Sequence, residues 1–599
     1  MKRFIEKYGK VGMSVLFGIL VFGFWRYLYV SVLSFQEEYQ LFLWTSDYAM
    51  ERIAVPGGLA SYVGEFITQF NHAPLFGAIG LSMVFVLFQG LTWLLGKKNG
   101  ADGSWYLLSF LPALALWAVM GDENVMLAFA VSLVAALGMM LLYHLTDGRV
   151  WTKWIYIIVG GPVFYWLFGP IAFLLVIYVC FHEWMNRRKG GQWYLFMPLL
   201  LVVLLSVIGS AYVVQYPLER LFAGLEYYRY PVYSSQKLVI VSLLTVVIPC
   251  IYAVLPSSSK KWVPGLVSMG MVLLGAGLIR MSFNQVKYDL IEYDFLVRTE
   301  RWSDVLAKAK ECDTKTPMTV AAVNLALSQK GLLADRIFEY YQNGSEGLIP
   351  TFNRDMSSPV MTAEIFFKMG MVNDAHRYMY EAQEAIPNYR KSGRFSKRIV
   401  QCEIVNGQYE VAAKYLRMFQ HTLFYKKWAD ETLELIQNPQ SLDKHPLYGW
   451  LRQIRFGGED FLFSDMEMDQ MFGLLFVGNK KNRMAYEYLI CYVLLQRDLD
   501  KFMKYYSLGQ YVGYKSIPRA FQEVLIGEWM QRNTDVRKIP YSVDSHVLNT
   551  TADFVRIYAS GRDRQLLNQP PYCYNALHYL LLNDLGKENR TQNELKEIY

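Results

Sequence analysis

Residues 34–48 read SFQEEYQLFLWTSDY, and they follow an apolar run, residues 11–33, that is long enough to cross a membrane. Two adjacent carboxylates, Glu37 and Glu38, therefore stand just beyond the predicted membrane span, and aromatic residues come after them. Four basic residues precede the apolar run, which predicts a cytoplasmic N-terminus. The segment 34–73 is thus predicted to be the first external loop.

The composition points to a membrane protein. Hydrophobic residues make up 53% of the 599 residues and charged residues only 19%, which is too apolar for a soluble protein of this size. The apolar residues form long runs up to about residue 282 and become periodic after it. The sequence therefore predicts two domains, a polytopic transmembrane domain (1–282) and an extracytoplasmic helical domain (283–599).

The charge is also divided unevenly between these two parts. The first 282 residues hold 19 Lys and Arg against 13 Asp and Glu, whereas the remainder holds 40 against 39. Basic residues that flank apolar runs indicate membrane topology rather than binding of nucleic acid, so no nucleic-acid partner is expected. The lipid bilayer is the first predicted partner. The expected location is a bacterial inner membrane with the C-terminal domain in the periplasm.

One apolar run, 154–184, is too long for a single span and is interrupted by glycine and proline at 160–162 and 169–170. Basic residues flank it on both sides, at 149–153 and 187–189, and positive charge stays on the cytoplasmic side. We therefore predict a hairpin of two short spans, although one long kinked helix is the alternative and would invert the later topology. With the hairpin the chain has about nine spans. The others are 11–33, 74–96, 105–120, 124–145, 193–213, 237–256 and 263–281.

The second half reads as one helix after another, which predicts an all-α fold for the whole chain. Small residues at Ala363, Gly370, Ala375 and Ala382 precede Pro387, and a similar pattern follows Gly370 by 37 positions at Gly407. This spacing resembles the tetratricopeptide repeat, which implies a superhelix with a concave surface for a protein or peptide partner. A helical domain without true repeats is the alternative.

Two carboxylate pairs are candidates for chemistry. Glu37 or Glu38, at a membrane surface, could act as a catalytic general base or hold a divalent metal that neutralises a leaving pyrophosphate. A solvated helix end is the alternative. Asp122 and Glu123 form a second external pair and are the candidate metal ligands, so the cofactor stays open, with a divalent metal as the candidate.

Several further residues are candidates for substrate binding. Arg26 lies in the outer part of the first apolar run, where it could bind a lipid-linked phosphate or extend its side chain to the interface. In the 214–236 loop, tyrosines alternate with Glu219, Arg220, Glu226 and Arg229, a mixture that suits a sugar or phosphate and equally an interfacial aromatic belt. Arg220 and Arg229 are its candidate substrate ligands. Asp47 and His72 belong to the first external loop and complete the set.

The sequence resembles two groups of known proteins. The segments QEEYQLF (36–42), PGGLA (56–60) and EFITQF (65–70) resemble an uncharacterised family of multi-pass proteins of Bacteroidetes, which implies no activity. The layout is also similar to the GT-C glycosyltransferases, which place an acidic residue directly after the first span and use polyprenyl-phosphate sugars. That likeness implies a catalytic role for the pair Glu37 and Glu38, although the pair here is Glu-Glu rather than Asp-Glu.

Two functions follow as hypotheses. The first is a GT-C-like glycosyltransferase that uses a lipid-phosphate-linked sugar on the outer face. The second is a non-enzymatic, membrane-anchored scaffold with tetratricopeptide-like repeats for envelope protein assembly. A transporter is a third interpretation, since broken helices line transport sites. The enzyme requires Glu37 or Glu38 to face a cavity shared with Asp122 or Glu123 and open to lipid.

Overall fold

The computed structural model describes residues 2–146, 149–186, 191–230, 236–255, 262–456, 467–533 and 535–583, and it is all-α over these residues. Their one β-type pairing is an isolated bridge between Val125 and Tyr228. The predicted fold class is confirmed. The chain forms two compact units: unit 1 comprises Met1–Tyr288, Pro387–Gly393 and Arg417–Ala429, and unit 2 comprises Asp289–Ile386, Arg394–Leu416 and Asp430–Tyr599. The predicted domain boundary after residue 282 stays a prediction.

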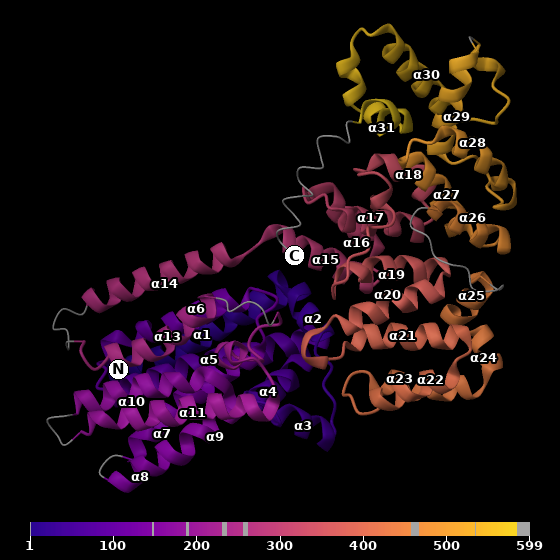
Figure 1. Ribbon diagram of the computed structural model, residues 1–599. Helices are drawn as coiled ribbons and strands as arrows, with labels where there is room; N and C mark the ends of the chain where they lie inside the picture. Colours follow the sequence, from indigo (N-terminus) through magenta and orange to yellow (C-terminus); the bar gives the residue numbers. More distant parts are fainter. Residues whose placement is uncertain are drawn as a thin grey trace. The chain divides into compact units, whose positions relative to one another are not determined.

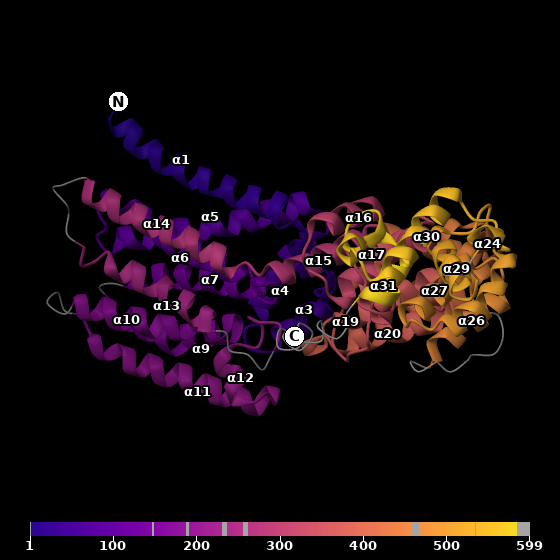
Figure 2. The same ribbon diagram turned by 90° about the horizontal axis from the view of Figure 1, so that it is seen from above.

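Unit 1 is a bundle of helices that run side by side, as Figures 1 and 2 show from two directions. Its helices are α1 (Lys2–Gly23), α2 (Val30–Glu38), α3 (Ser46–Ile53), α4 (Gly58–Thr68), α5 (Pro74–Lys98), α6 (Phe110–Met120), α7 (Leu127–Tyr143), α8 (Val150–Ile155), α9 (Gly161–Phe168), α10 (Phe173–Met185), α11 (Phe196–Val214), α12 (Leu218–Ala223), α13 (Gln236–Ile251) and α14 (Trp262–Ser282).

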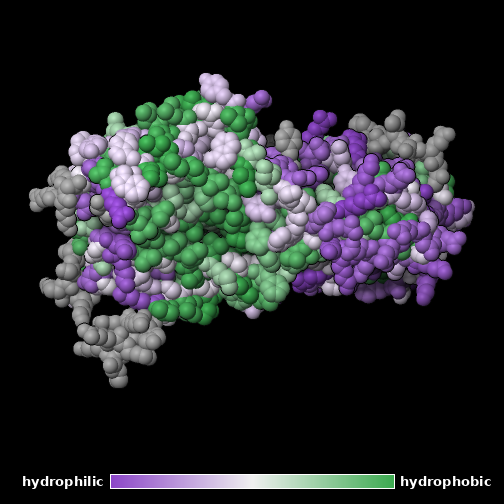
Figure 3. Space-filling view, turned by 90° about the horizontal axis from the view of Figure 1, so that it is seen from below, coloured by the Kyte–Doolittle hydropathy of each residue, from purple (hydrophilic) through white to green (hydrophobic). Residues whose placement is uncertain are grey.

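Among the residues that the structure describes, seven helical segments are long and apolar enough to cross a membrane: Gly9–Leu28, Pro74–Lys98, Gly103–Met120, Leu127–Thr146, Val150–Met185, Trp193–Val214 and Trp262–Arg280. Helix α13 is apolar but shorter. Many apolar side chains of unit 1 point outward, such as Leu20 and Leu205, and Figure 3 shows a broad hydrophobic surface over its helices. In water such a surface would be unfavourable, whereas lipid tails cover it without cost.

The segment Val150–Met185 folds back on itself as a hairpin. The ammonium of Lys153 in α8 forms a buried ion pair with the carboxylate of Glu183 in α10. A continuous helix would separate these residues by about 45 Å, at 1.5 Å for each residue. The turn is at Gly169, whose φ of 77° and ψ of −160° suit glycine alone. The two legs and α13 bring the apolar segments to the nine that were predicted, although the basic flank at 187–189 lies outside the described residues.

The segment 34–73, predicted to be the first external loop, is a folded helical corner rather than an open loop. Within the first predicted span, 11–33, helix α1 is followed by a π-helical turn, Phe24–Leu28. The helix is then interrupted at Tyr29, and α2 begins after it. Helix α2 carries Glu37 and Glu38 in its last turn. Helices α3 and α4 follow, and α4 packs against α7 and α9. The corner therefore belongs to the bundle and positions its polar side chains by packing.

Unit 2 consists of helices, four of which (α15, α21, α22 and α23) begin or end in unit 1. They are α15 (Gln285–Arg298), α16 (Trp302–Glu311), α17 (Pro317–Gln329), α18 (Leu333–Arg336), α19 (Ser358–Met369), α20 (Val372–Glu384), α21 (Gly393–Asn406), α22 (Tyr409–Phe419), α23 (Lys426–Gln437), α24 (Pro439–Lys444), α25 (Pro446–Ile454), α26 (Met468–Gly478), α27 (Arg483–Leu495), α28 (Leu499–Tyr506), α29 (Arg519–Arg532), α30 (Ser545–Ser560) and α31 (Ala576–Leu582).

The predicted repeat positions coincide with helix pairs. Gly370 and Gly407 have φ of 94° and 81° and form the turns between α19 and α20 and between α21 and α22. The alanines at 363, 375 and 382 are fully buried, as expected where two helices cross closely. The helix pairs are therefore present, and their identity as tetratricopeptide repeats stays a prediction.

Candidate functional site

A tight corner between α3 and α4 brings their polar side chains together. Thr45 caps α3 by accepting a hydrogen bond from the Tyr48 backbone N–H, 3.2 Å away. At the start of α4, a Cβ on Gly58 would lie 1.8 Å from the carbonyl oxygen of Arg52, so only glycine fits. This close approach lets Arg52 of α3 reach Glu65 one turn before the end of α4.

We call the polar side chains at this corner the buried ion cluster, which consists of Tyr48, Arg52, Ser61, Glu65, Glu226 and Arg390. Arg52 Nε lies 3.1 Å from Glu65 Oε2, and Arg390 Nη2 lies 3.1 Å from Glu65 Oε1. Arg390 also pairs with Glu226 and donates to Ser61 Oγ at 2.9 Å. Two arginines thus share two carboxylates within the protein, a neutral set that satisfies its own charges.

The protonation of the cluster follows from burial and from Glu65. Burial, reinforced by the Glu65 carboxylate, raises the pKa of the Tyr48 hydroxyl far above its usual range. Burial alone would lower the pKa of Arg52, but Glu65 outweighs it and raises that pKa. Tyr48 is therefore a neutral donor to Glu65 and Arg52 stays charged, which suits a structural cluster rather than a proton-transfer site.

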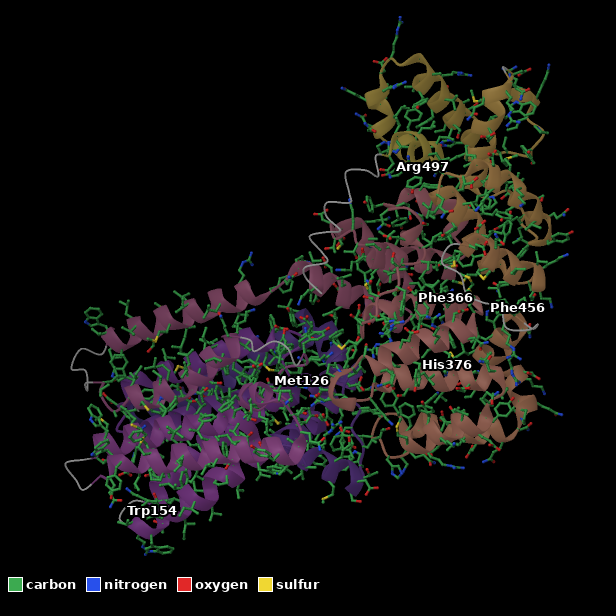
Figure 4. The ribbon with its side chains drawn as sticks, in the orientation of Figure 1. Met126, Trp154, Phe366, His376, Phe456 and Arg497 are labelled. Carbon is green, nitrogen blue, oxygen red and sulfur yellow. The ribbon has the colours of Figure 1, made fainter. Side chains whose placement is uncertain are left out.

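Two segments from the later part of the chain, 387–393 and 417–429, pack against the predicted external loop 34–73. The backbone N–H of Leu41 donates to the Lys391 carbonyl at 2.9 Å, and that of Trp44 donates to the His421 carbonyl at 2.8 Å. The sulfur of Met126, a residue labelled in Figure 4, lies 3.3 Å from Gln40 Nε2 and 3.8 Å from Arg390 Nη1. Segments 387–393 and 417–429 are therefore built into the predicted external loop.

The structure places the predicted catalytic pair inside this packing. Glu37 and Glu38 are 3% and 2% exposed. Glu37 Oε1 accepts a hydrogen bond from the Tyr425 hydroxyl at 3.1 Å and lies 3.6 Å from His72 Nδ1. The ring of His72 stacks on Phe424, with centroids 5.1 Å apart. The predicted residues Glu37 and His72 are thus brought together, against segment 417–429 rather than in a cavity that the structure describes.

A double-mutant cycle measures this contact. Glu37→Gln replaces the carboxylate acceptor of this buried hydrogen bond by a weaker amide oxygen, and Tyr425→Phe removes its donor, so each is expected to destabilise the protein by about 1–3 kcal/mol. The double variant should cost less than the sum, with a coupling of about 1 kcal/mol or more, in thermal unfolding of the full-length protein in detergent. Strict additivity would show that Glu37 does not hold segment 417–429.

Arg229 is buried in an aromatic environment. Its guanidinium lies 4.5 Å from the Tyr39 ring centroid and 5.2 Å from that of Phe35. None of its side-chain nitrogens donates a hydrogen bond to a described residue. Burial lowers its pKa. The arginine that was predicted to bind substrate thus contacts aromatic rings inside the protein.

The predicted metal ligands have other partners. Glu123 Oε1 lies 3.1 Å from Lys287 Nζ, and Asp122 Oδ2 accepts a hydrogen bond from the Tyr228 hydroxyl at 3.3 Å. Within the part of the chain that the structure describes, no group of three or more His, Cys, Asp or Glu side chains could hold a metal ion. Asp122 and Glu123 are thus a pair with protein donors, and their role as metal ligands stays a prediction.

The remaining candidates lie apart from one another. Arg26 is half-buried in the π-helical turn, with its guanidinium 5.3 Å from the Tyr27 ring centroid. Asp47 is exposed in the first turn of α3. Arg220 of α12 donates to the Asn388 side-chain oxygen at 3.0 Å and lines a cavity of about 250 Å³ between α10, α12 and α13.

Sequence reasoning missed Glu65, Arg390 and Tyr425, and it noted Glu226 only as one of the charged residues of the 214–236 loop. Glu65 stood in the EFITQF segment and Glu226 in the tyrosine-rich loop, so a carboxylate within an apolar stretch was the available signal. Arg390 and Tyr425 had no such signal, because nothing near them in sequence indicates a partner in the first 73 residues.

Comparison with known proteins shows that one family model matches most of the chain. A model described as "Family of unknown function (DUF6057)" matches residues 7–583. No curated protein and no solved structure matches the chain.

Proposed function

The chain belongs to the DUF6057 family of unknown function, and we propose that it is a membrane-anchored scaffold for envelope proteins. One observation carries the proposal: three buried carboxylates of unit 1 make internal contacts. Glu37 binds Tyr425, and Glu65 and Glu226 bind Arg390. A general base must reach its substrate, whereas these three groups are buried and each has a protein partner.

The chain connectivity supports the same proposal. Segments 387–393 and 417–429 belong to unit 1, and each is joined at both ends to residues of unit 2. The chain thus leaves unit 2, enters unit 1 and returns at each of these segments. Arg390 of the buried ion cluster fixes segment 387–393 to unit 1. An anchor that secures several loops of a helical domain suits the presentation of that domain to partners.

Unit 2 carries a candidate surface for a protein partner on α20 and α22. Tyr380 and Val411 are 47% and 37% exposed, although both are apolar enough to favour burial. His376, labelled on α20 in Figure 4, stacks on Tyr380 and lies 3.0 Å from a carboxylate oxygen of Glu403. Aromatic residues with a polar rim are typical of protein interfaces.

The scaffold is tested by cross-linking in the native host. Tyr380→Asp with Val411→Asp is expected to reduce cross-links to partner proteins about tenfold or more, since central apolar contacts each contribute more than 1 kcal/mol. The matched control is Met503→Asp with Leu566→Asp, two other exposed apolar side chains of unit 2. Equal cross-linking in both double variants and the wild type would contradict this surface.

Glycosyl transfer from a lipid-linked sugar is the second candidate, and one observation favours it. The cavity beside Arg220 combines a cationic side chain with apolar walls, as a lipid phosphate requires. Glu37→Gln with Glu38→Gln distinguishes the two functions. A scaffold keeps wild-type envelope glycans when the variant reaches normal membrane levels, whereas loss of a glycan at normal levels would support catalysis by these residues.

A further inference from the structure

The cavity between α10, α12 and α13 has two kinds of lining. Its polar lining comes from α12 and the segment after it, with Arg220, Tyr228 and Tyr230. Much of its apolar lining comes from α10 and α13, two of the apolar helices of unit 1, and Phe129 of α7 and Phe222 of α12 add to it. The volume is about 250 Å³, which suits a small headgroup rather than a whole lipid.

The apolar walls extend to the outer surface of the bundle. Ile177 of α10 and Leu243 of α13 line the cavity and are 41% and 43% exposed. Exposed apolar side chains on such helices contact lipid tails. A molecule in the cavity could therefore keep its hydrocarbon chains against α10 and α13 while its headgroup lies inside.

The polar side carries a positive charge without a carboxylate partner. Arg220 donates one hydrogen bond to the Asn388 side-chain oxygen, and its guanidinium lies 5.0 Å from the ring centroid of Tyr216. No ion pair joins Arg220 to a described carboxylate. An arginine side chain has five N–H donors in a planar fork that matches a phosphate, so most of them are available for an anion.

We propose that this cavity binds the phosphate of an anionic membrane phospholipid, with Arg220 as the anion ligand and the acyl chains along α10 and α13. The cationic side chain and the apolar walls are complementary to the two parts of such a lipid. The inference goes beyond the scaffold and does not rest on it, because the site belongs to unit 1 alone.

Native mass spectrometry of the full-length protein in detergent tests the site. The probes are dioleoyl phosphatidylglycerol and dioleoylglycerol, which has the same acyl chains but no phosphate, titrated separately. Wild type is expected to bind the anionic lipid about tenfold more tightly, which is the usual effect of one charge-assisted hydrogen-bonded pair. Arg220→Gln should lose that preference and Arg220→Lys should keep part of it. Ser242→Trp should block binding by filling the apolar side, since Ser242 lines the cavity.

Arg149→Gln is the matched control, because it removes one exposed arginine of unit 1, just before α8 and away from the cavity lining. It should bind the anionic lipid as wild type does. Melting temperatures of all variants show whether they are folded, and the comparison of Arg220→Gln with Arg220→Lys keeps the test valid if Ser242→Trp does not fold. Equal affinity for the two lipids, or unchanged preference in Arg220→Gln, would overturn the proposal. Displacement of the lipid by millimolar inorganic phosphate would also overturn it in favour of a free anion.

Discussion

Replacing Arg390 by methionine is expected to destabilise the full-length protein by about 3–5 kcal/mol. The arginine is 5% exposed and contacts Glu65, Glu226 and Ser61. Methionine has a similar volume but no charge, so the variant leaves Glu226 buried without its cation. Removing one partner of a buried ion pair costs more than the pair itself contributes. The measurement is the melting temperature of the purified protein in detergent.

The matched control is Arg377→Met. Arg377 forms an exposed ion pair with Glu381 at 2.8 Å one helical turn away, and such pairs contribute about 0.3–0.5 kcal/mol. A double variant with Glu226→Gln should recover part of the stability lost in Arg390→Met, because it removes the uncompensated charge. If Arg390→Met melts like Arg377→Met, the buried ion cluster does not hold segment 387–393.

The second large effect is expected at Gly58. In Gly58→Ala the new methyl would lie 1.8 Å from the Arg52 carbonyl oxygen and 2.9 Å from the Ile53 Cα, both backbone atoms that cannot move alone. The corner between α3 and α4 must open, at a cost of about 3 kcal/mol or more. Arg52 and Glu65 should then separate, which unfolding experiments in detergent would register as a lower melting temperature.

Gly90→Ala is the matched control for this substitution. Gly90 lies within α5, and a Cβ there would meet nothing within 4 Å. The variant should be neutral or slightly more stable, since alanine favours a helix over glycine. If both alanine variants melt together, the corner is looser than its geometry indicates and does not position the cluster.

Most of the fold could be predicted because its signals are local. Apolar runs of about 20 residues marked helices such as α5 and α11 of unit 1 to within a few residues, whereas α3 and α4 lie in a segment that was predicted to be a loop. The hairpin of α8 to α10 followed from glycine, proline and flanking charge, all within 40 residues. Gly370 and Gly407 similarly marked turns between neighbouring helices, since a left-handed backbone conformation favours glycine.

The candidate site could be predicted only in part. Glu37, His72, Arg220 and Arg229 were singled out by residue type and by their place beside apolar runs. Their surroundings were not predictable, because Glu37 meets Tyr425 across 388 positions and Ser61 meets Arg390 across 329. Local patterns carry no information about which distant segment will cover a surface.

The sequence by itself determined that this protein is all-α, rich in helices that can cross a membrane, and built with a hairpin and repeated helix pairs. Hydrophobicity and backbone conformation act over one or two turns, so they can be read from neighbouring residues. Only the tertiary structure decided that Glu37, Glu38 and Glu65 of the predicted external loop are buried. A carboxylate has the same sequence signature whether it faces water or an arginine, and its environment depends on the segments that pack on it.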